Sequence, residues 1–353
     1  MNIPQTTEEL KTVVDLRSIP LAYLIPAIFI PALALPYFAT SYFFVNTLIY
    51  ALLFIGLGQS WNIIGGYAGQ ISLGHAVMFA TGAYTTAILF IYYGITPYLG
   101  LIVAGLLAAA VGLTLGALTF RLRYHYFSIA TLAATLGIYV IFLQWDWIGG
   151  AVGLEYPIAQ IGDPLSLMFD SRQMYFYVMW GFALATTVLV YRLHTSKLGI
   201  YLKAIDIDQE LAENAGISAF WYKMYAMGLS SFIAGVGGGL FAQYVLFVEP
   251  RILLELIRNV EFVLIPVVGG LGTVLGPVVG AVIYIFTREY TRTLLGGTQT
   301  GLSWVIFGTI LVLISMYRPN GLIRRRPVIG GGKKNKTSTQ DSVAPEESEA
   351  DDD

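Results

Sequence analysis

Long apolar stretches alternate with short polar segments along most of the chain. A helix needs about 20 mostly apolar residues to cross the hydrocarbon core of a bilayer. Eight stretches meet that requirement: 21–39, 43–64, 72–93, 98–120, 126–148, 174–191, 223–247 and 301–317. The pattern therefore predicts an all-α integral membrane protein.

The basic residues between the spans predict how the chain is oriented. Lys and Arg in short loops are retained on the cytoplasmic side. They follow the fourth, sixth and last spans, as Arg121 and Arg123 with His125, then Arg192, Lys197 and Lys203, then Arg318 and Arg324 to Arg326. The loop 149–173 is mainly acidic, so we expect it outside. Counting back from the fourth span places the N-terminus inside.

A ninth apolar region, 257–287, is too long for one ordinary span. It is interrupted by Gly269-Gly270-Leu271-Gly272 and by Gly276-Pro277. Because the seventh span leaves the cytoplasm and the last span returns to it, residues 249–300 must cross an even number of times. Two short crossings or a re-entrant hairpin satisfy this condition. We favour two crossings, which predicts about ten transmembrane or half-membrane helices and two cytoplasmic termini.

The composition agrees with the membrane class and bounds the chemistry. Of 353 residues, 56% are hydrophobic and only 12% are charged, whereas soluble domains carry about 25% charged residues. The absence of cysteine excludes disulfides and thiolate sites, and the three histidines lack metal-ligand spacing. We expect no cofactor, no metal and no nucleic-acid partner.

Three regions differ in composition. Residues 1–20 are expected to form a cytoplasmic N-terminal segment, and 21–322 the transmembrane domain. Residues 323–353 are first basic and then acidic, a composition typical of disorder. The tail is either an interaction segment or a solvated extension, and we favour the extension.

One polar, glycine-rich segment lies between two apolar stretches. It reads Gly65-Gly66-Tyr67-Ala68-Gly69-Gln70-Ile71-Ser72-Leu73-Gly74-His75. Irregular polar backbone survives at membrane depth only where it is buried in protein or lines a cavity. The segment is therefore either part of a pathway through the protein or a tight cytoplasmic turn before a packing helix, and the residues favour neither.

Few ionisable residues lie within or near the apolar stretches: His75, Asp146, Glu249 and Glu261. Such residues tend to face cavities or partners. Asp146 lies between two tryptophans of an aromatic belt, which explains it without a function. His75 is either a neutral hydrogen-bonding residue at a helix start or a substrate contact. With so few acids and bases, a proton-relay transporter is poorly supported.

The largest cytoplasmic loop, 192–222, has a partly helical apolar rhythm. Leu202, Ile205, Ala212 and Ala215 recur at helical spacing, and Gly216 is a natural helix C-terminus. A short amphipathic helix here lies either on the lipid headgroups or in a groove of a soluble partner. Its acidic side chains disfavour an anionic membrane surface, so we expect docking to a partner.

That partner is expected to supply the energy for transport, because the chain has no phosphate-binding Gly-x-x-x-x-Gly-Lys-Ser/Thr motif. The glycine cluster 235–239 lies inside an apolar span and has the small-xxx-small spacing of closely packed membrane helices. Gly276 and Gly280 have the same spacing.

Several motifs in one order resemble the LivM-type permease subunits of branched-chain amino acid ABC importers. They are Gly66 to His75 with Gly82-Ala83-Tyr84, Leu122-Arg123 with Tyr126 to Leu132, Ser196-Lys197-Leu198-Gly199, Ala204-Ile205 to Gly216-Ile217, Val268 to Gly272 with Leu275-Gly276-Pro277, and Arg318-Pro319-Asn320-Gly321-Leu322. The resemblance covers about 43–322. The block Leu122–Leu132 favours LivM over the LivH-like partner.

The resemblance implies a type II-like ABC importer permease fold in the cell membrane, without catalytic residues. It implies four kinds of partner besides membrane lipid: a second, LivH-like permease, two ATP-binding subunits and an extracytoplasmic substrate-binding protein. ATP hydrolysis on those partners would drive alternating access.

The same resemblance assigns two sets of residues. The translocation pathway, expected at the permease–permease interface, would involve Gln70, Ser72, His75, Tyr84, Glu261, Gly269, Gly270 and Gly272. The ATPase-coupling segment would involve Lys203, Ala204, Asp206, Asp208, Glu210, Ala212, Glu213 and Gly216. Asp206 and Gln209 depart from the family pattern, which tends to have Arg and Glu there.

Leucine, isoleucine and valine are the expected substrates, with other amino acids, urea or short amides as alternatives in the same importer class. An ion-gradient-driven secondary transporter is the second hypothesis, since broken helices are also found there. An integral membrane enzyme ranks last, because no nucleophile–base set is present.

Overall fold

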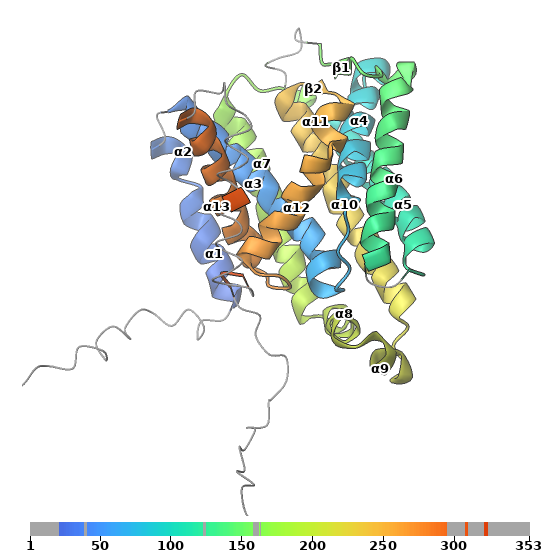
Figure 1. Cartoon of the computed structure of the whole chain (residues 1–353). Coiled ribbons are helices and arrows are strands. Elements are labelled where there is room, and N and C mark those ends of the chain that lie inside the picture. Colours follow the sequence, from blue (N-terminus) through green and yellow to red (C-terminus); the bar gives the residue numbers. More distant parts are fainter. Residues whose placement is uncertain are drawn as a thin grey trace, which may run out of the picture.

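The computed structural model describes residues 21–38, 41–122, 125–157, 162, 164–294, 308–309 and 321–323. They form a helical bundle with two short helices at one end and a two-stranded sheet at the other (Figure 1). We refer to these as the α8–α9 end and the β1–β2 end.

Within the described residues, six helices are long and apolar enough to cross a membrane. They are α3 (Tyr42–Asn62) with its π-helical extension Ile63–Tyr67, α4 (His75–Tyr93), α5 (Pro97–Thr119), α6 (His125–Gln144), α7 (Arg172–Thr195) and α10 (Ala219–Val245). Six of the eight predicted spans are thus confirmed as helices of membrane length, and the chain is an all-α, multi-pass membrane protein.

The predicted first span is shorter than expected. Stretch 21–39 forms α1 (Leu21–Ala32) and α2 (Leu35–Phe38), separated by a tight turn. Pro26 and Pro31 lie inside α1, and each proline removes a backbone donor that a continuous helix would use. The predicted span 301–317, the N-terminal segment 1–20 and the tail from 324 onward lie outside the described residues, apart from residues 308 and 309.

The broken region 257–287 consists of two helices that meet at the glycines, an arrangement that fits either two short crossings or a re-entrant hairpin. After α11 (Pro250–Leu254), α12 (Leu256–Gly269) runs toward the α8–α9 end and α13 (Gly276–Leu294) returns (Figure 1). The 14 residues of α12 extend about 21 Å, less than the roughly 30 Å hydrocarbon core. The count of ten crossings therefore remains a prediction.

Glycines allow the central helices to approach closely. The position that a Cβ of Gly238 in α10 would occupy is taken by the backbone of Phe79 in α4, and Gly82 lies against the backbone of Gly235. Gly280 in α13 lies against the carbonyl of Ile265 in α12 in the same way. The predicted close packing at the glycine cluster of α10 is confirmed, and α10 lies at the centre of the bundle against α3, α4 and α5.

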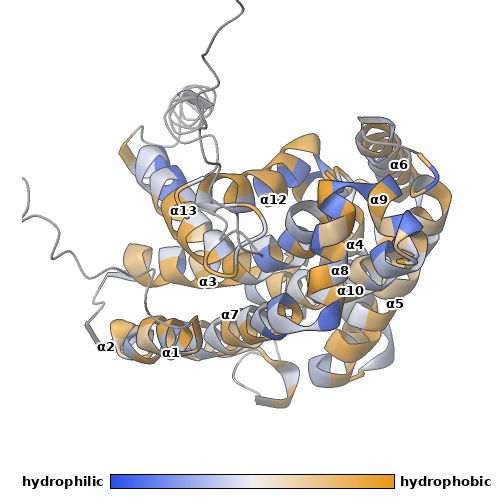
Figure 2. Ribbon diagram, turned by 90° about the horizontal axis from the view of Figure 1, so that it is seen from below, coloured by the Kyte–Doolittle hydropathy of each residue, from blue (hydrophilic) through white to orange (hydrophobic). Residues whose placement is uncertain are grey.

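The β1–β2 end is made by the loop that we expect outside. Strand β1 (Leu154–Glu155) pairs antiparallel with β2 (Phe247–Val248), and short 3₁₀ turns cover Asp146–Ile148 and Pro164–Ser166. At the opposite end, α8 (Lys197–Ile207) and α9 (Gln209–Asn214) project below the bundle between α7 and α10 (Figure 1). The hydropathy of the ribbon seen from that end is drawn in Figure 2, where α5 and α6 lie at the periphery.

Candidate functional site

The polar segment predicted from the sequence is a break between two membrane helices. Helix α3 widens into a π-helical turn and the chain is then irregular until α4 begins at His75. Trp61 Nε1 donates to the Ser72 carbonyl at 2.8 Å, and Ser128 Oγ donates to the Ile71 carbonyl at 2.6 Å. Side chains from α3 and α6 thus supply the hydrogen bonds that the missing helix does not, as membrane depth requires.

Gln70 is not beside His75. Together with Gly69 it lines a pocket of about 410 Å³ at the α8–α9 end, whereas His75 is buried between the helices. Gly69 has a φ of +67° and its missing side chain leaves room for the Asp206 carboxylate. Glycine therefore meets both a backbone and a packing requirement at the junction of this segment with α8.

Ser72 and His75 lie inside the bundle. Ser72 is fully buried and its Oγ accepts a hydrogen bond from the Gly74 amide. His75 is 2% exposed, and its Nε2 lies 2.8 Å from Ser230 Oγ in α10. The two residues share the α4 N-terminus but make separate contacts.

Asn259 is a residue that sequence reasoning did not single out. Its Oδ1 accepts a hydrogen bond from the Ala76 amide at 3.0 Å, which joins α12 to the first turn of α4. The sequence did contain an indication: Asn259 is a polar side chain inside the apolar region 257–287, and a buried amide requires a hydrogen-bonding partner.

Tyr84 and Glu261 occupy two further environments. The ring of Tyr84 packs edge-on against Phe142, with the ring centroids 5.0 Å apart. Glu261, 3% exposed, accepts hydrogen bonds from Tyr284 at 2.7 Å and from Arg288 at 2.9 Å, and it pairs with Arg258. The carboxylate is thus paired and hydrogen-bonded, which is the condition for burying a charge. Arg258 and Arg288 also lie over the Phe54 ring.

The glycines of the α12–α13 turn are held by α3. Asn62 Oδ1 accepts from the Gly272 amide at 2.9 Å, and its Nδ2 donates to the Thr273 carbonyl. Gln59 donates to the Val274 carbonyl at 2.7 Å. Gly270 has a φ of +131°, and the amide of Ile323 donates to the carbonyl of Gly269. The structure therefore brings the turn together with α3 and with residues 321–323, whereas His75 and Glu261 make their contacts elsewhere.

The predicted coupling segment is two helices rather than one. The chain turns at Asp208, whose extended backbone ends α8 and whose carboxylate accepts from the Leu211 amide at the start of α9. Aspartate favours such N-cap positions because it satisfies a free amide of the first turn. Gly216, with a φ of +85°, follows α9 and is the helix-ending glycine that the sequence predicts.

The side chains of this segment face in different directions. Lys203 is buried, with its amine 3.2 Å from His194 Nδ1 and over the Tyr67 ring, so it joins α8 to α7 and to the π-helical turn. Ala212 is buried in a small apolar cluster with Ile205 and Ala219, and Ala204 is partly buried against the same cluster.

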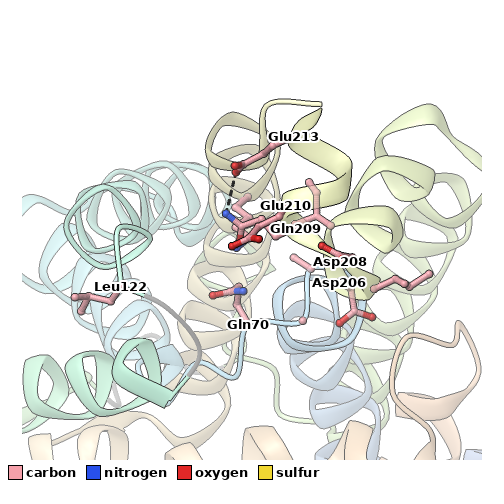
Figure 3. Close-up of a pocket in the computed structure, with 12 residues that line it drawn as sticks. Gln70, Leu122, Asp206, Asp208, Gln209, Glu210 and Glu213 are labelled. Carbon is pink, nitrogen blue, oxygen red and sulfur yellow. Dashed lines mark hydrogen bonds between the residues drawn. The ribbon is translucent and has the colours of Figure 1, made fainter. Parts of the chain in front are cut away.

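The acidic residues of the segment surround the pocket (Figure 3). The lining includes Gln70, Leu122, Asp206, Asp208, Gln209, Glu210, Glu213 and Lys223. Lys223 donates to Gln209 Oε1 at 2.8 Å, and Gln209 donates to Glu213 at 2.9 Å. Hydrogen-bonded side chains thus connect α10 to α9 along the pocket wall.

Comparison with known proteins assigns the family. Residues 42–315 match the family described as branched-chain amino acid transport system, permease component. The chain is 31% identical over 303 residues to the high-affinity branched-chain amino acid transport system permease protein LivM of Escherichia coli strain K12, covering 78% of this chain and 68% of LivM.

More distant relatives come from Methanocaldococcus jannaschii. A probable LivM permease is 25% identical over 347 residues, covering 83% of this chain and 97% of the relative. A probable LivH permease is 27% identical over 284 residues, covering 77% and 87%. No solved structure matches the chain. The length of the family match and the identity to LivM together show that this chain belongs to the branched-chain amino acid transport permease family.

Proposed function

We propose that this chain is the translocating, non-catalytic subunit of an ATP-driven importer of branched-chain amino acids in the cell membrane. Its partners are a LivH-like second permease, two ATP-binding subunits and an extracytoplasmic substrate-binding protein. The observation that carries the proposal is the α8–α9 segment, which projects from one end of the bundle and presents apolar side chains. Ile207 is 79% exposed and Leu211 is 68% exposed.

These two side chains support docking because exposed apolar groups on a projecting element are typical of contact surfaces. Burial of one leucine side chain contributes about 1.5–3 kcal/mol. The acidic pocket beside them contributes charge, which favours specificity more than affinity. We place the α8–α9 end in the cytoplasm, since Arg192 and Lys197 flank it and basic loops are retained there.

Uptake by proteoliposomes that contain the co-purified complex tests this proposal. Leucine uptake is expected to require the binding protein outside and ATP inside, and to persist when ionophores collapse ion gradients. Recovery of the chain alone, with uptake driven by an ion gradient, would make it a secondary carrier. ATP-dependent uptake of urea or short amides without leucine uptake would support an ATP-driven importer but show that its substrate is not a branched-chain amino acid.

The second permease is expected to pack against α6. The exposed residues of α5 are mostly large, including Leu99, Ile102 and Leu106, and three of its four glycines lie against α10. The exposed face of α6 contains Ala133 and Gly137, and within the described part of the chain nothing lies within 4 Å of the position where a Gly137 Cβ would be. Small residues permit close helix packing in membranes, whereas lipid-facing positions have no need of them.

Gly137→Leu is therefore expected to reduce recovery of the second permease about 5- to 150-fold, because overpacking a close contact costs about 1–3 kcal/mol. Gly181→Leu in α7 is the matched control, since among the described residues nothing lies within 4 Å of the position where a Gly181 Cβ would be either. Quantitative pull-down measures both variants. Equal recovery of the second permease with both variants would exclude α6 as the contact.

A further inference from the structure

Two buried side chains at the N-terminus of α4 each have one polar atom that finds no hydrogen-bond partner among the residues that the structure describes. They are His75, 2% exposed, with its Nδ1, and Asn259, 1% exposed, with its Nδ2. Both residues lie at the first turn of α4. His75 is the first residue of that helix, and Asn259 is hydrogen-bonded to the amide of the next residue, Ala76. A buried polar atom without a partner costs about 1–3 kcal/mol, so the pair requires a physical explanation.

The hydrogen bonds determine which atom donates and which accepts. The Ala76 amide can only donate, so the oxygen of Asn259 faces it and the two N–H groups of Nδ2 are left free. Ser230 gives its one hydroxyl proton to the Ser60 carbonyl at 2.7 Å. His75 Nε2 must therefore be the donor toward Ser230 Oγ, which leaves Nδ1 as an acceptor in the neutral ring.

The start of α4 adds a favourable environment for a negative charge. Amides of the first helical turn lack partners within the helix and give the N-terminus a partial positive charge. Gly74 precedes the helix without a capping side chain, and no acidic residue lies in the first turn. Discontinuous membrane helices of transporters direct such ends at anionic substrate groups.

We propose that this site binds the backbone of an amino acid during translocation. The substrate carboxylate accepts from Asn259 Nδ2 at the N-terminus of α4, and the substrate ammonium donates to His75 Nδ1. The inference rests on the proposed function and specifies which part of the substrate this chain recognises. Because both side chains are buried here, binding requires the helices around the site to move apart far enough to admit the substrate, while the Asn259–Ala76 hydrogen bond holds the amide in place.

Asn259→Asp separates this role from a structural one. Aspartate keeps the size of the side chain and the oxygen that receives the Ala76 amide, but it replaces the free donor with a second oxygen that repels a carboxylate. Asn46→Asp is the matched control, because the Oδ1 of Asn46 accepts the Tyr244 hydroxyl and this acceptor is likewise retained.

The measurement is leucine uptake, together with stimulation of ATP hydrolysis by leucine-loaded binding protein, in the reconstituted complex. Asn259→Asp is expected to lower uptake about 10- to 100-fold, the loss of one charge-assisted hydrogen bond, while stimulation of hydrolysis persists. Asn46→Asp is expected to retain both activities.

Wild-type uptake by Asn259→Asp would overturn the inference and leave a bound water as the partner of the two atoms. Loss of both uptake and stimulated hydrolysis, with the Asn46 control intact, would also overturn it, because that result identifies a structural role. If the unaltered complex imports no leucine, the proposed function itself fails, which is seen before any variant is tested.

Discussion

Leu211→Glu is expected to abolish ATP-driven uptake and to release the ATP-binding subunits, while the permease still inserts into the membrane. Leu211 is 68% exposed on α9, so the substitution removes little packing within the described part of the chain. It replaces a side chain whose burial at an interface contributes about 1.5–3 kcal/mol by a charge that must be desolvated. We therefore expect at least about a 100-fold weaker association.

Pull-down of the ATP-binding subunits measures this effect, and leucine uptake confirms it. Val152→Glu is the control, because Val152 is 82% exposed at the β1–β2 end, opposite to α9. That variant is expected to keep its ATP-binding subunits. If Leu211→Glu also keeps them, the α8–α9 segment is not the docking surface.

Glu261→Gln is expected to destabilise the bundle by about 3–5 kcal/mol, the cost of breaking a buried ion pair. The glutamine leaves Arg258 without the carboxylate it pairs with, while Arg288 keeps its contact with Glu289 at 3.0 Å. The cluster joins α12 to α13 against the Phe54 ring of α3, so its loss loosens the hairpin as a unit.

Thermal unfolding of the purified permease in detergent measures this loss as a lower midpoint temperature. Glu255→Gln is the control for removing a negative charge, because Glu255 is exposed and makes no side-chain cap to α12. Its effect is expected to stay within about 0.5 kcal/mol. An unchanged midpoint for Glu261→Gln would show that the ion pair contributes no net stability.

Properties that depend on residues adjacent in the sequence were predictable. The length of an apolar stretch determines whether a helix crosses the bilayer, so six spans were recognised without a structure. Gly216 follows the end of α9, and the glycines at 269, 270 and 272 divide α12 from α13. Both breaks were predictable because glycine readily adopts the backbone conformations that end a helix. Asp208, which divides α8 from α9, was readable in principle as an N-cap.

Properties that depend on how the helices face one another were not predictable. Helices such as α3, α5 and α10 are apolar on all sides, so no periodic polar face indicates which neighbour each one meets. For this reason Gln70, only five residues before His75, lies with α8 and α9 instead, and Lys203 points into the bundle.

The sequence by itself determined the class of the protein, its membrane-length helices, the break before His75 and the family to which it belongs, because each of these is carried by contiguous residues. Only the tertiary structure decided which side chains meet across the breaks. Asn259 reaches the first turn of α4 across 183 residues of sequence, and Arg288 meets Glu261 across 27. Close packing at glycines, as between Gly280 of α13 and Ile265 of α12, brings such helices near enough for these contacts.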